Sequence, residues 1–521
     1  MSVRPVWPQA IDFFPLLPIF WQTTDEQLSH DGGLLLFRQL DERLALTRDF
    51  AAALDDPRDP DLRQHSFLEM VRQRVYGILA DHEDQNDADT LRADPVLKLL
   101  CGRRPDGADL ASQPTLSRFE NSISIASLKR LRQLFVDQFI ASFATAPRSL
   151  TLDLDAVDDP AHGHQHLTFW HNYYDQNQYL PLVVSCADND LLVSLSLRHG
   201  SAHAALGADD DLEYVVTRLR AAWPCVSLHA RADAAFGIPA MYRVCERLGL
   251  TYSFGLQGNA VLKRETESLL ARALAAWETE RRAAREQERA AVPARLFDGF
   301  WYRAGGWEHP RWVVAKAEAN EQGSQRRFVV TNRPGAALLP GPAYDEYAAR
   351  GESENRFKEG KCDLHMGRLS DHRFVANYFR LYLHGLALNL VVRMRRLVAL
   401  PEPVAEPVVR GAAEPAAHGA APQPVEPVAA AETAPAAEPP VVPREAREGR
   451  ERRQGFNRRR QRDVLGEGQP ETWRRQVIKA VVRVVSSGRR VVILLGAGWP
   501  HLEQFRQVLE RLLAALAVPP P

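Results

Sequence analysis

The stretch Ser149-Leu-Thr-Leu-Asp-Leu-Asp-Ala-Val157 alternates apolar and polar residues, which predicts a β-strand with one buried face. Residues 1–145, before it, read mainly as amphipathic helices joined by polar turns. Two apolar runs after it, Leu180–Cys186 and Leu191–Leu197, are predicted to be the next two strands. The change of pattern near residue 149 therefore marks the start of a sheet.

Helices and strands alternate after these three strands. A helix over residues 211–222 is predicted before the strand Cys225–Ala230, and a helix over residues 238–248 before the strand Leu250–Leu256. Three successive strands followed by helix and strand in turn predict an α/β fold with a mixed sheet covered by helices.

A second β-rich region follows a charged helix predicted at residues 264–291. The Gly305-Gly306 pair suits a turn between its first two strands, and helical periodicity returns at residues 341–396. Four aromatic residues of this region are either core residues of the β-rich part or surfaces on which a displaced DNA base stacks. The predicted strands are Phe297–Arg303, Arg311–Glu318 and Arg326–Thr331, and the aromatic residues are Trp301, Tyr302, Trp307 and Trp312.

The C-terminal part has two unusual compositions. Residues 401–443 are almost wholly Pro, Ala, Val and Glu, which predicts a disordered, semi-extended linker. Residues 444–475 contain eleven arginines against six acidic residues, a net charge of +5, which favours non-specific DNA binding. A solubilising tail is the alternative interpretation of this segment. A short strand-and-helix tail closes the chain.

Length and composition narrow the class of protein. A chain of 521 residues is too long for one core, so several domains are expected. The formal net charge is −1, so any DNA-binding charge must be local. Five cysteines without zinc-ligand spacing predict a reducing cytoplasm and no disulfides. The absence of a transmembrane-length apolar run and of a signal-peptide pattern predicts a cytoplasmic protein with no membrane partner.

Four polar residues in the helical region fall on one predicted helix face. They are Tyr347, Arg350, Glu354 and Lys361, named here the Tyr–Arg–Glu–Lys array. At about 100° per residue on an α-helix, they lie within roughly a 60° arc. A carboxylate flanked by two cations and a phenol suits a catalytic acid beside a phosphate backbone. Because Gly351 costs about 1 kcal/mol inside a helix, the helix alternatively restarts at Ser353, and a solvated polar face is the plain alternative.

The spacing Tyr-x2-Arg-x3-Glu-x6-Lys resembles the signature of bacterial insertion-sequence transposases of the DDE type. Further stretches, such as Gln113-Pro-Thr-Leu-Ser-Arg-Phe-Glu-Asn121 and Asn355-Arg-Phe-Lys-Glu-Gly-Lys361, look like blocks of one subgroup of that family. The resemblance implies an α/β fold with an RNase H-like mixed-sheet catalytic core. This core is interrupted by a β-rich insertion and preceded by an α-helical N-terminal domain.

The resemblance also implies a division of the chain into six regions. The N-terminal helical region would bind DNA, and the insertion would separate two parts of the RNase H-like core, of which the second carries the catalytic Glu helix. A disordered linker and a basic C-terminal tail would follow. The expected bounds are 1–145, 146–260, 261–338, 339–400, 401–443 and 444–521, in that order.

The family needs two further acids, and suitable candidates precede the array. Asp153 and Asp155 share one face of the strand at 149–157. The usual Asp-x-Thr of the family aligns with Asp155-Ala-Val157, which favours Asp155 over Asp153, although valine stands in place of threonine. Asp233 follows the strand Cys225–Ala230 and precedes a predicted helix, where a turn or cap role is the alternative.

These matches assign roles to named residues. The resemblance implies that Asp155, Asp233 and Glu354 are catalytic and bind two Mg²⁺ ions, for which Mn²⁺ can substitute. Three clustered acids repel one another, and the two ions relieve that repulsion. The remaining members of the Tyr–Arg–Glu–Lys array would position DNA phosphates, and Arg368 is a further candidate for that role.

The implied activity is DNA cleavage at transposon ends followed by strand transfer into target DNA, of the cut-and-paste type. The implied partners are double-stranded DNA, both terminal inverted repeats and target, and a second copy of the chain in a homodimer. The protein would be associated with the nucleoid. The alternatives are an RNase H-like nuclease without strand transfer and an inactive, domesticated DNA-binding protein.

Overall fold

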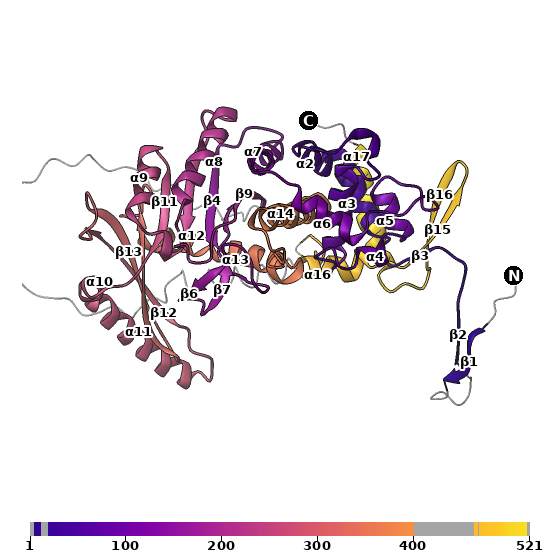
Figure 1. The fold of residues 1–521 in the computed structure, drawn as a ribbon. Coiled ribbons are helices and arrows are strands. Elements are labelled where there is room, and N and C mark those ends of the chain that lie inside the picture. The colour runs from indigo at the N-terminus through magenta and orange to yellow at the C-terminus, as the bar shows by residue number, and fades with distance from the viewer. Residues whose placement is uncertain (1–4, 12–18, 401–462, 467, 518–521) are drawn as a thin grey trace, which may run out of the picture.

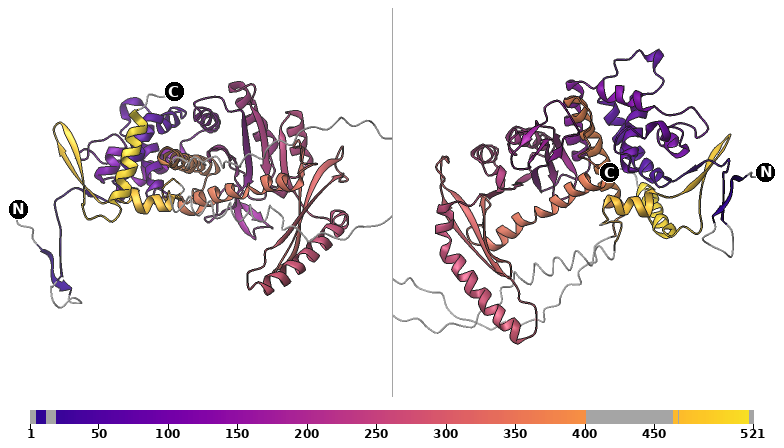
Figure 2. Two further views of the ribbon diagram at one scale, coloured as in Figure 1. Left: turned by 180° about the vertical axis from the view of Figure 1, so that it is seen from behind. Right: turned by 60° about the horizontal axis from the view of Figure 1, so that its bottom comes forward.

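The computed structural model describes residues 5–11, 19–400, 463–466 and 468–517, with side chains from residue 23 on except those of Ser353 and Glu354. Figure 1 shows a sheet-based part beside a helical part, in which indigo N-terminal helices lie next to yellow C-terminal segments. The long helix α14 (Phe374–Val398) lies between the two parts, as the right-hand view of Figure 2 shows.

The central sheet has eight strands in the order β12-β13-β14-β11-β10-β4-β8-β9. Strand β10 is parallel to both of its neighbours, β4 and β11, and the other pairs are antiparallel. The expected α/β fold with a mixed sheet is therefore confirmed. The strands are β4 (Ser149–Ala156), β8 (Leu182–Cys186), β9 (Leu192–Ser196), β10 (Ser227–Ala232), β11 (Thr251–Leu256), β12 (Ala294–Tyr302), β13 (Arg311–Asn320) and β14 (Gly323–Thr331).

Burial explains why these segments are strands. Leu150, Leu152 and Leu154 of β4 alternate into the core, and all five residues of β8 are buried, which is typical of a strand covered on both faces. Helices α7 (Ile125–Ile140) and α14 pack against β9. Helix α8 (Ala208–Ala222) packs on α9 (Pro239–Arg247), which covers β11.

The second β-rich region continues the same sheet, because β14 pairs antiparallel with β11. The sequence predicted its three strands but not that they extend the central sheet. Helix α11 (Glu267–Glu286), which follows α10 (Ala260–Glu265), packs against β12 and β13 and runs along this end of the molecule. Residues 294–331 therefore share the sheet that carries Asp153 and Asp155.

The N-terminal helices pack around α14. This helix is mostly buried along its 25 residues, and its buried residues include the polar Arg380, His384 and Arg395 as well as apolar side chains. It contacts α1, α2, α3, α6 and α7. The remaining elements before the sheet are β1 (Pro5–Ile11), β2 (Ile19–Gln22), β3 (Leu28–Ser29), α1 (Leu34–Leu44), α2 (Leu46–Ala52), η1 (Pro60–Leu62), α3 (Phe67–Leu79), α4 (Ala88–Leu91), α5 (Pro95–Leu100) and α6 (Gln113–Asn121).

The C-terminal segment folds onto these N-terminal helices. Strand β15 (Val482–Ser487) pairs with both β16 (Arg490–Leu495) and β3, and α17 (Leu502–Ala517) packs on α1 and α14. A Cβ atom on Gly33 would lie 1.9 Å from the carbonyl oxygen of Val477. The N-terminal and C-terminal segments therefore touch at a position where only glycine fits.

The last part of the arginine-rich segment 444–475 folds against the rest of the chain. Arg474 is buried in η4 (Arg474–Ile478), after the short helix α16 (Pro470–Trp473), and donates hydrogen bonds to Glu471 and to the carbonyl oxygen of Asp363. Nine of the eleven arginines and the predicted linker at 401–443 lie outside the described residues. In the part of the chain that the structure describes, no helix is long and apolar enough to span a membrane.

Candidate active site

Two candidate acids lie side by side where β4 and β10 end. In the parallel register of these strands, Arg231 is opposite Asp153 and Ala232 is opposite Leu154. Continuing by one residue places Asp233 beside Asp155. Side chains two residues apart project from the same face of a strand. Both carboxylates therefore extend from one face of the sheet, at the carboxyl ends of β4 and β10.

Asp153, two residues before Asp155 on β4, has both carboxylate oxygens bound by one arginine. Its side chain is 1% exposed, and its two oxygens accept hydrogen bonds of 2.7 Å from Nε and Nη2 of Arg231. Burial raises the pKa of Asp153, and the Arg231 guanidinium opposes that rise. Arg231 also donates a 2.8 Å hydrogen bond to the carbonyl oxygen of Glu346. This arginine therefore ties both strands to the helix that carries Tyr347.

Asp155 and Asp233 are more accessible than Asp153. Oδ2 of Asp155 lies 3.8 Å from Nη1 of Arg350, and its side chain is 17% exposed. Oδ1 of Asp233 accepts a hydrogen bond of 2.9 Å from the backbone N–H of Ala235 and caps the short helix η2 (Ala234–Phe236). The sequence expected Asp233 at a strand end before a helix, and the structure has it there.

The Tyr–Arg–Glu–Lys array does not lie on one α-helix, so that part of the prediction is wrong. Tyr347 is in α12 (Pro340–Ala348), whereas Arg350 is the N-cap residue of α13 (Gly351–Lys358). The break falls where Gly351 weakens the helix, two residues before the restart considered at Ser353. Lys361 lies in η3 (Glu359–Asp363), a π-helical segment whose wider turn rotates it out of the α-helical register.

Tyr347 lies close to the turn that follows Asp233. A Cβ atom on Gly255 of β11 would be 2.7 Å from Oη of Tyr347 and 2.7 Å from the backbone nitrogen of Ala234. Burial raises the pKa of Tyr347, Arg350 lowers it, and the charge of Asp233 raises it again. The phenol is therefore protonated at neutral pH and can donate a hydrogen bond beside the two carboxylates.

Lys361 and Arg368 have acidic partners. Nζ of Lys361 lies 2.7 Å from Oδ2 of Asp158, just beyond β4. Arg368 makes long ion pairs of 3.9 Å with Glu83 and 3.8 Å with Asp84, and its side chain is 45% exposed. These described contacts connect Arg368 to the N-terminal helices. The structure describes only the backbone of Glu354, which is helical and lies within α13.

Sequence reasoning missed three residues around the acids: Arg231, Gly255 and Tyr174. Tyr174 follows β6 in a small sheet, and its pKa is raised to about 12 by burial and by the charges of Asp158, Asp155 and Asp233. The one available signal was for Arg231, a charged residue directly after the predicted strand Cys225–Ala230 and two residues before Asp233. The small sheet consists of β5 (Asp159–Pro160), β7 (Gln176–Tyr179) and β6 (Phe169–His171).

The aromatic residues of the second β-rich region divide into two kinds. Trp307 is 5% exposed and packs edge-on against Tyr242 and Tyr302. Trp301 is 69% exposed and contacts Trp312 edge-on at 5.5 Å between ring centroids. Trp307 is therefore a core residue, as the simpler interpretation expected.

The donor set at this edge fits a hard divalent cation. Mg²⁺ prefers carboxylate oxygens, and Asp155 and Asp233 present two carboxylates from adjacent strands. The cations near them, Arg350 and Lys361, lie within reach of Asp155 and Asp158 respectively. An anion such as a phosphate, held next to a bound cation, would meet both kinds of group.

Comparison with known proteins identifies the family. The profile of the family "Transposase DDE domain group 1" matches residues 18–409, which is most of the chain. The chain therefore belongs to this family of DDE transposases, whose process is transposition by DNA recombination. No curated protein matches the chain.

A similar solved structure is described as "Drosophila P element transposase strand transfer complex". Its sequence is 13% identical to the chain, with a TM-score of 0.18. The match covers 33% of this chain and 36% of that one, so it spans little more than a third of that transposase.

Proposed function

We propose that the protein is the transposase of a bacterial insertion sequence, which cleaves DNA at the transposon ends and joins them to target DNA. The observation that carries this proposal is the parallel register of β4 and β10, whose last pair, Leu154 and Ala232, is followed on the two strands by Asp155 and Asp233. The resemblance to DDE transposases implies two aspartates and a glutamate as the catalytic acids, and these two aspartates with Glu354 would supply them.

Glu354 is the proposed third acid. Arg350 connects the start of α13 to Asp155, since Nη1 of the arginine is 3.8 Å from Oδ2 of the carboxylate. Residues four apart share one side of a helix, so position 354 lies on the same side of α13 as Arg350, the residue that contacts Asp155. Asp155 is preferred to Asp153, because Arg231 occupies both oxygens of Asp153.

Two Mg²⁺ ions are the proposed cofactors, with Asp155, Asp233 and Glu354 as their ligands and Mn²⁺ as a substitute. When bound, such a pair activates the attacking oxygen and stabilises the leaving oxygen of an in-line displacement at phosphorus.

The protein groups around the acids would orient the DNA. Tyr347 would donate its hydroxyl hydrogen to a phosphate oxygen, and Arg350 would hold a phosphate beside Asp155. Lys361 would contact phosphate by exchanging its partner Asp158 for the DNA backbone. Arg368 is assigned a more distant phosphate contact, on the side of the N-terminal helices.

The proposed partners are the terminal inverted repeats, target DNA and a second copy of the chain. We assign end recognition to residues 1–145 and the reaction to residues 146–260 and 339–400, with the β-rich insertion at 261–338. A nucleoid-associated, cytoplasmic enzyme would meet both DNA substrates. The basic segment that follows the linker 401–443 would add non-specific DNA affinity.

The test is a strand-transfer assay with Mg²⁺, a DNA fragment bearing the inverted repeats that flank the reading frame, and a supercoiled target plasmid. We expect 3′-end cleavage and joined product from the wild type, and neither from Asp155→Asn, Asp233→Asn or Glu354→Gln. Asp298→Asn is the matched control, because Asp298 is an exposed aspartate on β12 of the same sheet.

The outcomes separate the alternatives. Cleavage without joined product would identify a nuclease and overturn the transposase proposal. DNA binding without metal-dependent cleavage would identify an inactive DNA-binding protein. Equal loss of activity in Asp298→Asn would show that the assay reports general damage to the fold and not the acidic site.

A further inference from the structure

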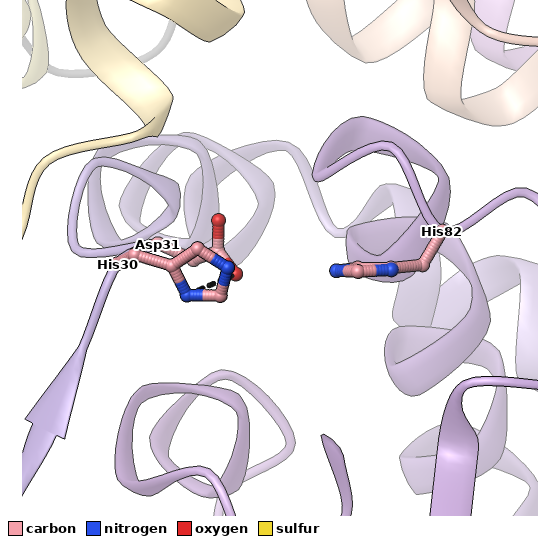
Figure 3. Close-up of side chains that lie close together, drawn as sticks. All are labelled: His30, Asp31 and His82. Carbon is pink, nitrogen blue, oxygen red and sulfur yellow. Dashed lines mark ion pairs between the residues drawn. The ribbon is translucent and has the colours of Figure 1, made fainter. Parts of the chain in front are cut away.

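Three potential metal ligands meet in the helical part of the molecule, beside the contact between the N-terminal and C-terminal segments. His30 and Asp31 lie between β3 and α1, and His82 lies in the turn after α3. Figure 3 shows the imidazole of His82 extending across toward His30 and Asp31 from a separate part of the helical region. One nitrogen or oxygen atom from each side chain lies within 4.8 Å of the others.

Asp31 places a buried negative charge in this group. Its side chain is 0% exposed, and its Oδ2 accepts no hydrogen bond among the described residues. Lys479 lies 2.8 Å from Oδ1, whereas Nδ1 of His30 lies 3.6 Å from Oδ2. Oδ2 is therefore the oxygen that faces the histidines, while Oδ1 faces the lysine. A cation at Oδ2 would leave the Lys479 contact in place.

His82 is oriented in the way that metal-binding histidines are. Its Nδ1 lies 3.0 Å from Oδ2 of Asp87, and its Nε2 is buried with no hydrogen-bond partner in the described structure. A carboxylate on one ring nitrogen fixes the tautomer and leaves the lone pair of the other nitrogen for a metal. A buried polar atom without a partner is otherwise unfavourable. The Asp87–His82 pair thus directs an unused ligand atom toward Asp31.

Two imidazole nitrogens and one carboxylate oxygen suit zinc-like divalent ions better than Mg²⁺. In a tetrahedral zinc site with bonds of about 2.0–2.1 Å, ligand atoms lie about 3.4 Å apart. The group must therefore contract by roughly 1–1.5 Å from its present spacing. His30 can make this movement, because its side chain is 53% exposed.

We propose that His30, Asp31 and His82 bind one divalent transition-metal ion of the zinc class, with water as the fourth ligand. The ion joins the turn before α1 to the turn after α3. Through the Asp31–Lys479 contact it also reaches the segment that leads into β15. The site lies on other elements than the acidic residues at the ends of β4 and β10.

The test measures metal binding in a protein whose acidic site is disabled by Asp155→Asn and Asp233→Asn. The full chain is treated with chelator, dialysed and titrated with Zn²⁺ by calorimetry and with Co²⁺ by visible absorption. We expect one high-affinity equivalent per chain, the intense visible bands of tetrahedral Co²⁺, and a higher unfolding temperature with Zn²⁺.

Three variants grade the expected loss. His82→Gln removes a ligand and should weaken binding by more than about 100-fold, and His30→Gln should act in the same direction. Asp87→Asn leaves all three ligands but removes the group that orients His82, so a loss of about 10–100-fold is expected. His309→Gln is the matched control, because His309 is 53% exposed, as His30 is, and pairs with Glu246.

Binding that is unchanged in both His82→Gln and His30→Gln, or no binding by the parent protein, would overturn the proposal. Equal weakening in His309→Gln would do the same, since it would show adsorption to surface histidines. Because the parent protein lacks two acids of the proposed active site, these results are independent of whether the chain carries out strand transfer.

Discussion

Arg231 donates two hydrogen bonds of 2.7 Å to the carboxylate of Asp153. This pair lies two residues before Asp155 and Asp233 on the adjacent strands β4 and β10. Two aspartates on the same face of one strand therefore have different tasks. Asp153 neutralises a buried guanidinium, and Asp155 faces the helix start at Arg350. The distinction can be tested because the two tasks affect different measurements.

Asp153→Asn should destabilise the protein, because it leaves Arg231 buried without a counter-charge. The expected cost is about 3–5 kcal/mol of unfolding free energy, measured by urea denaturation. Asp155→Asn should change the unfolding free energy by less than about 1 kcal/mol and abolish metal-dependent DNA cleavage. The assignment of the first acid would be reversed if Asp153→Asn kept native stability and lost cleavage while Asp155→Asn still cleaved.

Gly255→Ala should impair cleavage more than stability. The added methyl group would lie 2.7 Å from Oη of Tyr347 and from the backbone nitrogen of Ala234, so the tyrosine and the turn after Asp233 must move apart. A displacement near 1 Å at a reacting centre lowers rates by about 100-fold. Single-turnover cleavage measures the effect. Gly305→Ala is the control, since its added Cβ meets no atom within 4 Å; a similar rate for both variants would contradict the prediction.

Trp473→Ala should weaken the attachment of the C-terminal segment. Trp473 is 0% exposed, packs edge-on against Phe37 and donates a 2.9 Å hydrogen bond to the carbonyl oxygen of Leu465. Truncation of a buried tryptophan costs about 3–5 kcal/mol, which urea unfolding would detect. Trp301→Ala, at a 69% exposed position, should cost far less. Equal costs at the two positions would show that the segment does not depend on this contact.

Stability should fall in acid because two histidines are buried in neutral form. Burial lowers the pKa of His229 and of His384 to about 3, with nearby arginines adding to the effect. The unfolded chain takes up protons as the pH falls below about 6.5, whereas these folded-state histidines do so only near 3. Each therefore contributes stability that is present above about pH 6.5 and is lost toward pH 3, by about 2 kcal/mol at about pH 5.

His384→Gln tests the contribution of one of these groups. Nδ1 of His384 donates a hydrogen bond to the carbonyl oxygen of Leu364, and a glutamine amide can replace that donor. Urea unfolding at about pH 7.5 and pH 5 should show a pH dependence smaller by about 2 kcal/mol than that of the wild type. An unchanged difference between the two pH values would show that folding does not lower the pKa of His384.

Local sequence patterns predicted most elements of the sheet. The stretch 149–157 became β4, and the segments expected around 225–230 and 250–256 became β10 and β11, because alternation and apolar runs report burial directly. The position of Asp233 at the end of its strand followed from the same reading. The pairing of β14 with β11 could not be predicted, since strand partners are chosen by contacts distant in sequence.

The helical geometry around the Tyr–Arg–Glu–Lys array could not be predicted from sequence periodicity. A uniform angle of about 100° per residue assumes a continuous α-helix. The chain instead restarts at Gly351 and widens into the π-helical segment at Glu359–Asp363. The latter contains the buried Glu359, which accepts hydrogen bonds from Arg356 and Arg395. These tertiary contacts leave no periodic trace in the sequence, and neither does the Arg231–Asp153 pair.

The pairing of β15 with β3 has a consequence for how the protein is made. The first helices pack on residues that are synthesised long after them, so the N-terminal part cannot complete its core until β15 and α17 have been made. Contacts between distant segments form slowly, because a long loop must close before they contribute. A polypeptide that ends within the linker would lack Trp473 and expose the apolar surface around Phe37. Only a chain translated through α17 can therefore bury the surface that surrounds its first helix.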